Sequence, residues 1–186
     1  MQKRKVTVIA LVLACLAFVG SGTVAYFTTE EKAHNVITTG NIDIELLEWA
    51  DEEKNTPFAD VDGVMPGTTA TKIVEVKNTG GNAAFVRVKV KKEIVMNNQE
   101  DIRDLDMVSL DINENYWEEK DGFYYYKEIL DPGKVTSEPL FTTVTFAEGM
   151  GNLYQECTIH ISVSAQAVQA DNNGTDSLTA SGWPSN

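Results

Sequence analysis

The sequence predicts an all-β domain, a β-sandwich with jelly-roll-like connectivity, preceded by a signal helix and followed by a disordered tail. Three observations support this. Apolar and polar residues alternate with a period of two from Asn41 onward, as in strands that bury one face. Pro, Gly, Asn and Asp cluster between the alternating runs, where they favour chain reversals. The first 25 residues have the composition of a secretory leader.

The leader has three parts. Its basic start holds Lys3, Arg4 and Lys5, and a mostly apolar run follows from residue 6 to residue 19. This run is shorter than the roughly 20 residues that a membrane-spanning helix needs. Small residues then precede Ala25, so we expect cleavage between Ala25 and Tyr26. The alternatives are an uncleaved anchor and a lipidated Cys15, although the apolar run continues past that cysteine.

The remaining chain divides into a sandwich over residues 26–170 and a polar tail over residues 171–186, which we expect to be disordered. We expect about seven or eight short strands, mostly in the following stretches. The clearest runs are residues 40–47, 72–78, 84–95, 123–129, 136–146 and 157–168. In the last run, Cys157 falls on the core face and His160 on the opposite face.

Turn residues lie between these runs. They are residues 65–67, 78–82, 120–122 and 131–133. The acidic stretch from Trp49 to Gly63 is typical of a loop, and a short helix is expected somewhere within residues 97–110.

The charge excludes one class of partner. The formal net charge is −13, and removing the three leader cations brings it to about −16. A chain this acidic repels phosphate backbones, so we expect no nucleic-acid partner. Of the two cysteines, Cys15 lies in the leader, which leaves Cys157 without a disulfide partner in the mature chain.

Motifs for hydrolysis and nucleotide binding are absent. The two histidines, His34 and His160, are far apart and no His-Glu-x-x-His is present. A zinc hydrolase needs about three protein ligands and an open position. We therefore predict no catalytic residues, no metal ligands and no enzyme activity, although a Ser-His-Asp group assembled in space stays open.

Two clusters offer weaker alternatives. Acidic residues at 51–53 and 60–62 could supply oxygen ligands to calcium, but their spacing does not follow a helical calcium loop. Solvated loop charge is the simpler interpretation, and we expect no cofactor. The aromatic residues Tyr116, Trp117 and Tyr124–Tyr126 could stack on sugar rings, but core packing and cross-strand pairing explain them as well.

Several motifs resemble a known family. They are Gly22-Thr-Val-Ala-Tyr-Phe-Thr28, Asn35–Ile44, Met65-Pro-Gly67, Ile73–Gly80 and, more loosely, Leu130–Gly133 and Ile161–Gln169. Together they resemble the TasA/camelysin family of exported proteins in Gram-positive bacteria. The resemblance implies processing by a dedicated signal peptidase and a jelly-roll subunit of extracellular biofilm-matrix fibres. Some members of the family also carry a metallopeptidase label, but this sequence contains no recognised zinc-binding motif to support that activity.

We therefore expect a secreted, cell-surface-associated structural subunit that associates with itself. A glycan-binding or surface-binding module and a camelysin-like metallopeptidase are the alternatives. After cleavage we expect no segment in the membrane. The candidate assembly strand includes Val36, Ile37 and Thr38, whose residue types favour an extended chain. Freed by cleavage, it could pair with an exposed strand edge of a neighbouring copy.

Overall fold

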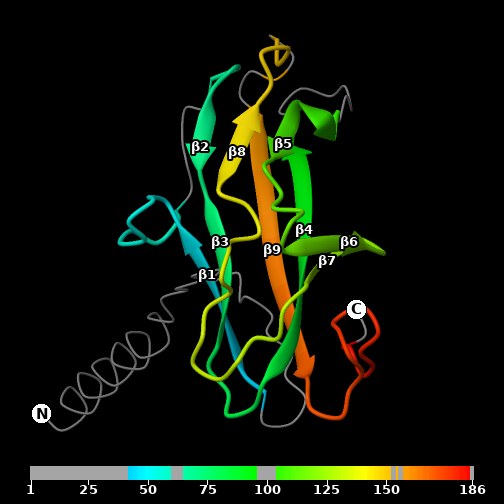
Figure 1. Ribbon diagram of the computed structural model, residues 1–186. Helices are drawn as coiled ribbons and strands as arrows, with labels where there is room; N and C mark the ends of the chain where they lie inside the picture. Colours follow the sequence, from blue (N-terminus) through cyan, green and yellow to red (C-terminus); the bar gives the residue numbers. More distant parts are fainter. Residues whose placement is uncertain (1–41, 60–64, 96–103, 152–153, 155–156, 185–186) are drawn as a thin grey trace, which may run out of the picture. The chain divides into compact units, whose positions relative to one another are not determined.

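The computed structural model describes residues 42–59, 65–95, 104–151, 154 and 157–184. All of them belong to one compact unit within residues 34–186. The described part is built from antiparallel strands and one short 3-10 turn, which confirms the predicted all-β sandwich (Figure 1). The elements are β1 (Ile44–Trp49), β2 (Thr69–Thr71), β3 (Ile73–Asn78), β4 (Ala84–Val95), η1 (Leu105–Met107), β5 (Val108–Leu110), β6 (Trp117–Lys120), β7 (Phe123–Tyr126), β8 (Thr143–Phe146) and β9 (Thr158–Gln169).

One layer is a four-stranded sheet with the order β6-β7-β4-β9. Strands β4 and β9 pair along their whole length, from Ala84 opposite Gln169 to Val95 opposite Thr158. They lie side by side in Figure 1. The β6–β7 hairpin turns through Asp121 and Gly122, whose φ angles of 53° and 75° match a two-residue primed turn.

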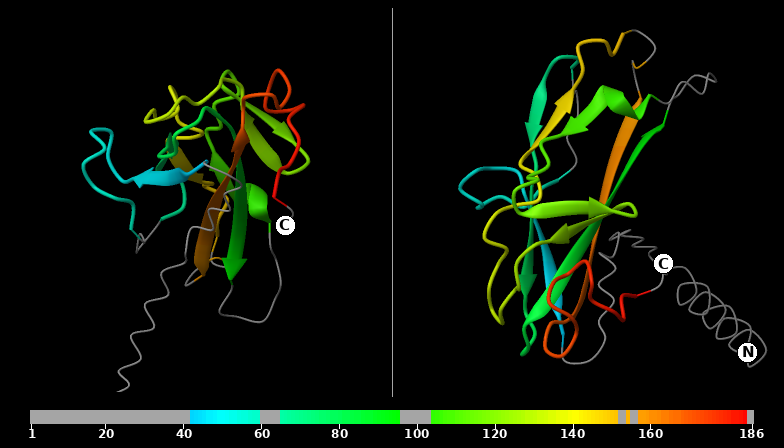
Figure 2. Two further views of the ribbon diagram at one scale, coloured as in Figure 1. Left: turned by 90° about the horizontal axis from the view of Figure 1, so that it is seen from below. Right: turned by 45° about the vertical axis from the view of Figure 1, so that its right-hand side comes forward.

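The other layer joins two smaller sheets, β1-β3 and β2-β8-β5. The chain before β8 connects them, because it runs beside β3. Thr136 N donates to Val76 O at 2.9 Å and Leu140 N donates to Val74 O at 2.8 Å. Val74 N in turn donates to Phe141 O at 3.0 Å. The two layers can be followed in the right-hand view of Figure 2.

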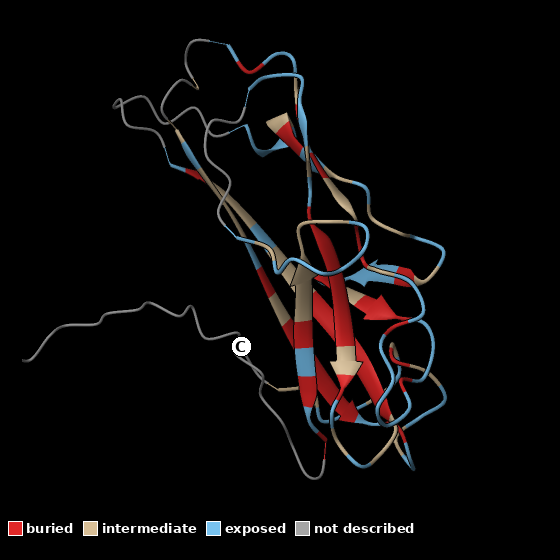
Figure 3. Cartoon of the chain, turned by 90° about the vertical axis from the view of Figure 1, so that its left-hand side faces the viewer, coloured by how far each residue is buried: buried red, intermediate tan, exposed pale blue. Residues whose placement is uncertain are grey.

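The core lies between the layers and follows the strand alternation. Val74 and Val76 of β3 meet Val86 and Val88 of β4, and all four are fully buried. Burial of a valine side chain stabilises a fold by about 1.5–3 kcal/mol. Figure 3 shows that the buried stretches follow the strands, whereas the connecting loops are mostly exposed.

The expected strands occur with small changes at their ends. The run at 123–129 pairs as a strand only to Tyr126, and of the run at 136–146 only Thr143–Phe146 is a regular strand. The expected short helix is the single turn η1 within the described residues. Residues 50–59 form a loop, as predicted.

The prediction of a disordered tail is wrong for residues 171–184. Ser177 is 2% exposed, and its hydroxyl donates to Tyr126 O at 2.7 Å. Trp183 packs with Ala180 against the buried Phe85. A polar composition indicated disorder, but the specific contacts of Ser177, Ala180 and Trp183 hold this segment on the four-stranded sheet.

Candidate functional site

The strand edges are candidate assembly sites because unpaired backbone groups there can accept another chain. In the described part, the outer strands of the sheets are β9, β6, β1 and the strands flanking β8. β6 has four residues and includes Glu118, Glu119 and Lys120. β9 has twelve residues and no Asp, Glu, Lys or Arg. Natural edges are blunted by shortness or charge, and β9 has neither protection.

In the described part, no strand pairs with β9 on the side away from β4, although β1 packs close to it and most of Val163–Val168 is buried. The hydrogen-bond pattern fixes which backbone groups line that side. Ala170 N donates to Ala83 O at 2.9 Å, so this pair is hydrogen-bonded in the ladder. Ala84 instead exchanges two bonds with Leu130 on the other side of β4. Because hydrogen bonding alternates along an antiparallel pair, the N–H groups of Ile159, Ile161 and Val163 point away from β4.

The same residues face the core with their side chains. Val163 is 8% exposed, but Ile159 and Ile161 are only half-buried although they pack against the main core cluster. An additional strand beside β9 would therefore cover apolar surface as well as pair backbone groups.

The edge of β1 is partly closed by its own loop. Ala50 N donates to Thr56 O and Phe58 N donates to Glu48 O, both at 2.9 Å. Beneath this loop Lys72, 3% exposed, forms a short ion pair with Glu48, and its ammonium lies 3.7 Å from the centre of the Phe58 ring. Lys54 pairs with the buried Glu75 at 2.6 Å.

A buried arginine marks the outer face of the four-stranded sheet. Arg87 of β4 is 8% exposed. Its Nε and Nη2 donate to Gln166 Oε1 at 2.8 and 2.6 Å, and Nη1 donates to Tyr125 Oη at 3.0 Å. The guanidinium carbon lies 3.9 Å from the Phe123 ring centre and 4.6 Å from that of Trp183.

This cluster was not predicted from the sequence. The signal was present in the alternation, which places Arg87 on the outer face of β4, and in an isolated Trp183-Pro184 pair within a polar segment. Only the structure shows that the two meet.

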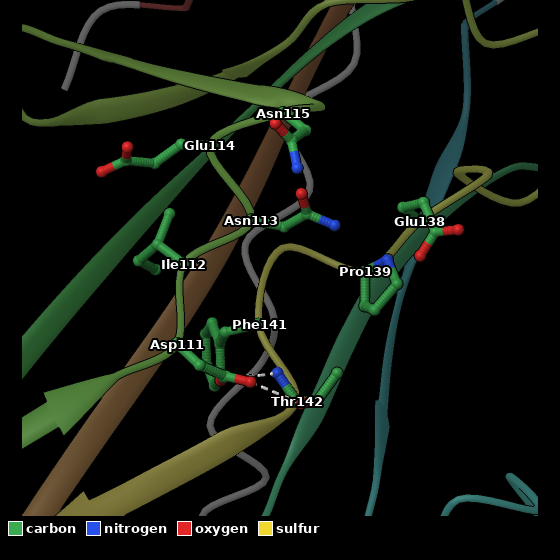
Figure 4. A pocket seen from close by; sticks show the side chains of 9 residues that line it. All are labelled: Asp111, Ile112, Asn113, Glu114, Asn115, Glu138, Pro139, Phe141 and Thr142. Carbon is green, nitrogen blue, oxygen red and sulfur yellow. Dashed lines mark hydrogen bonds between the residues drawn. The ribbon is translucent and has the colours of Figure 1, made fainter.

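A shallow pocket of about 460 Å³ opens between the chain after β5 and the chain before β8 (Figure 4). Asp111, Glu114 and Glu138 line it together with Asn113 and Asn115. Asp111 already accepts from Thr142 N at 2.9 Å, from Thr143 N at 2.6 Å and from the Thr142 hydroxyl. Its carboxylate therefore ties two segments of backbone together.

The family described as camelysin metallo-endopeptidase matches residues 1–130. The chain belongs to the camelysin family. The resemblance inferred from the motifs is thereby confirmed. A comparison with curated proteins finds no match. The matched range ends just after β7, so β8, β9 and the C-terminal segment lie beyond it.

The metal that the camelysin family description implies does not fit the described residues. Among them, no three His, Cys, Asp or Glu side chains lie where they could hold one ion. His160 stands opposite Glu93 across the β4–β9 pair. His34, Asp60 and Asp62 fall outside the described residues. We therefore derive no step through a metal.

In the acidic cluster at residues 51–53, Asp51 has a structural role. Asp51 accepts from Asn55 N at 3.1 Å and from Thr56 N at 2.7 Å, which closes the loop after β1. A hydrogen bond from the Thr56 side chain, followed by that from the Asn55 backbone, lowers the Asp51 pKa below its ordinary value.

Of the aromatic residues, Trp117, Tyr125 and Tyr126 are buried, whereas Tyr116 and Tyr124 are half-buried. Trp117 is 1% exposed, and its ring centre lies 4.9 Å from that of Tyr126. Tyr125 is 6% exposed, with its ring 5.6 Å from Trp183. Residue Tyr125, which a glycan-binding hypothesis would use, is therefore covered by residues 171–184.

Cys157 lies just before β9, is half-buried and packs against the core cluster on the face that the alternation predicted. Burial raises the pKa of its thiol. The cleavage residues Ala25 and Tyr26 and the assembly residues Val36, Ile37 and Thr38 lie outside the described residues. In the described part, no helix is long and apolar enough to cross a membrane.

Proposed function

We propose that this camelysin-family chain is an exported structural subunit of extracellular fibres in a biofilm matrix. The observation that carries the proposal is the edge of β9 over Thr158–Ser162, where the strand is exposed or half-buried and has no formally charged side chain. The TasA/camelysin resemblance, with its matrix-fibre members, supports the same role.

The leader supplies the timing. Cleavage between Ala25 and Tyr26 releases residues 26–40, and the segment around Val36, Ile37 and Thr38 then pairs with β9 of a neighbouring copy. While the leader stays in the membrane, this segment is held back and the chain stays monomeric. After release the mature chain is secreted and stays associated with the cell surface.

Strand addition derives its strength from two sources. Each new backbone hydrogen bond contributes on the order of 0.5–1.5 kcal/mol net. The half-buried Ile159 and Ile161 gain additional cover on the core side. Because the donor and the acceptor are different surfaces, the contact does not close on itself and open filaments result.

The first experiment places a lysine on each face of β9. In Ile161→Lys the new charge points toward the core, where a paired strand would bury it, so we expect fibre formation by the processed chain to fall at least tenfold. Ser162→Lys is the matched control, since Ser162 is exposed on the opposite face. We expect it to assemble normally. Electron microscopy and sedimentation measure both, and equal assembly of the two variants would exclude β9 as the acceptor.

The second experiment tests the donor. Deletion of residues 26–39 should leave a folded monomer, because the core strands begin at Ile44. Val36→Pro should weaken assembly and spare the fold, since proline removes a backbone donor. Fibres from the deleted chain would show that another segment is the connector. An unfolded product would show that the segment is a strand of its own sandwich.

A metallopeptidase is the second candidate, favoured by the description of the matching family as a metallo-endopeptidase. It predicts chelator-sensitive cleavage of a general protein substrate by the processed chain. Loss of that cleavage on His34→Ala and His160→Ala would support it. Fibre formation that is unaffected by chelators would separate the two functions.

A further inference from the structure

Residues 171–184, here called the C-terminal arm, complete a site whose other half belongs to the four-stranded sheet. The sheet contributes Arg87, Phe123, Tyr125 and Gln166, here called the socket. The arm contributes the ring of Trp183 and the carbonyl of Pro184, which accepts from Arg87 Nη2 at 3.2 Å. Among the described residues, the arm thus supplies two of the contacts of Arg87, an aromatic face and a carbonyl acceptor.

The charge of the socket is unusual. Within the described part, the hydrogen-bond acceptors around Arg87 are all neutral: an amide oxygen, a phenol and a backbone carbonyl. A buried cation needs such partners, because burial removes its hydration. The Trp183 ring supplies an additional electron-rich face on one side of the guanidinium. Removal of the arm would leave Arg87 without these two contacts.

The arm is held together largely by its own hydrogen bonds. The Asn173 side chain donates to Ser181 O at 3.0 Å and accepts from Ser181 N at 2.9 Å. Asp176 accepts from Thr179 N at 2.9 Å. Among the described residues, three hydrogen bonds join the arm to strands of the sheet: Ser177 donates to Tyr126 O, Arg87 donates to Pro184 O, and Asn173 Nδ2 donates to Gln169 O. The bonds of Asn173 with Ser181 and of Asp176 with Thr179 lie within the arm, so they do not depend on which sheet the arm docks on.

A turn connects the arm to β9. Asn172 and Gly174 have φ angles of 59° and 88°, and Gly182, directly before Trp183, has a φ of 78°. Asn172 precedes the Asn173–Ser181 pair, so a change in its dihedral angles redirects the rest of the arm without disturbing the β4–β9 pair.

We propose that the socket is a docking site for the C-terminal arm of a second copy, and that copies exchange their arms. An arm that docks within its own chain makes the same contacts when it docks on a neighbour. In dilute solution the chain's own arm has an effective concentration on the order of millimolar and occupies the socket. Arm exchange competes with docking of the chain's own arm where neighbouring copies are held at a similar, millimolar local concentration.

Two full-length variants test this by complementation. Trp183→Ala retains the socket but lacks the docking ring, and it carries an affinity tag. Arg87→Met lacks the guanidinium but retains the arm, and it is untagged. In the mixture, the arm of the second chain can complete the socket of the first. We expect the tagged chain to capture the untagged chain at least tenfold above a control mixture.

In the control mixture the untagged chain carries both substitutions, so its arm cannot dock. Pairing at the β9 edge contributes equally to both mixtures, and failure of the proposed fibre function leaves the comparison intact. Equal capture in the two mixtures overturns the proposal. Circular dichroism checks that each variant is folded.

A second measurement serves if Arg87→Met does not fold. A synthetic peptide of residues 171–184 is titrated into the Trp183→Ala chain and followed by calorimetry. We expect saturable binding with a Kd below about 1 mM and none for the peptide that carries Trp183→Ala. Absence of saturable binding by the native peptide overturns the proposal.

Discussion

Single side chains hold the sandwich together at places where charge enters its interior. Lys72 is buried against Glu48 and the Phe58 ring, while the Glu48 side chain keeps 16% of its surface accessible. The two partners therefore differ in what remains when the other is removed. Loss of Glu48 leaves a buried cation, whereas loss of Lys72 leaves an anion that water can reach.

This difference predicts unequal effects of two substitutions. Glu48→Gln should lower the free energy of unfolding by about 3 kcal/mol, at the lower end of the range for broken buried pairs. Lys72→Met should cost only about 1 kcal/mol, since its apolar chain still packs on Phe58. Urea unfolding measures both. If Lys72→Met lowered the free energy of unfolding more than Glu48→Gln does, the expected order would be wrong and the Lys72 ammonium would be the more important partner.

The thiol of Cys157 gives a second prediction at this scale. Burial raises its pKa, so less thiolate is present at a given pH and alkylation is slower. In a Cys15→Ser background, the folded chain should react with iodoacetamide several-fold more slowly than the urea-unfolded chain. Its rate should also rise at a higher pH than the rate of the unfolded chain. Equal rates would show that Cys157 is fully accessible.

At the scale of elements, the C-terminal arm depends on the turn from Asp176 to Thr179. The Thr179 side chain, followed by its backbone N–H, lowers the pKa of Asp176. Because the pKa of Asp176 is lowered in the folded state, its hydrogen bonds stabilise the turn fully at any pH above the ordinary aspartate pKa. The stabilisation is lost as the pH falls through the lowered value.

Acidification should therefore loosen this turn. The amide resonance of Thr179, followed by NMR between pH 7 and pH 2, should move with a midpoint below the ordinary aspartate pKa. The Asp176→Asn variant should lack that transition. A midpoint at or above the ordinary value would mean that Thr179 does not cap the Asp176 carboxylate in solution.

The elements also show how far the sequence predicts the structure. Long alternating runs such as Ala84–Val95 and Thr158–Gln169 were predictable, because a buried face imposes a period of two over many residues. Strands of three residues, such as β2 and β5, carry too few positions for a period to appear. Their pairing is decided by their neighbour β8.

The candidate sites were less predictable. Nothing in the sequence of β9 says that it lies at an edge, because a central strand would be equally apolar. The contact between Arg87 and Trp183 joins residues 96 positions apart, and the polar composition between β9 and Trp183 indicated disorder. Residue composition reports average burial, whereas a few specific contacts hold the arm.

For the whole molecule, net charge governs how copies meet. The chain has a formal charge of −13, and removal of residues 1–25 would make it more acidic still. Like-charged copies repel over the screening length, which is about 30 Å at 10 mM salt and about 8 Å at 150 mM. Screening should therefore speed association.

We expect the initial rate of fibre formation to rise several-fold between about 10 mM and 150 mM NaCl. Light scattering follows the rate. Calcium chloride at the same ionic strength should have a similar effect if screening alone operates. A much larger effect of calcium would show that the acidic side chains bind the ion, and a rate that falls with salt would contradict repulsion.

The length of the β4–β9 pair has a mechanical consequence. Twelve consecutive residues of β9 are in register with β4, without a break, from Thr158 to Gln169. A neighbour's strand laid along the opposite side of β9 would form a lap joint. Tension along the strands would load its hydrogen bonds in shear, all at once, instead of peeling them one by one. Shortening that overlap from either end should lower the force at which two subunits separate.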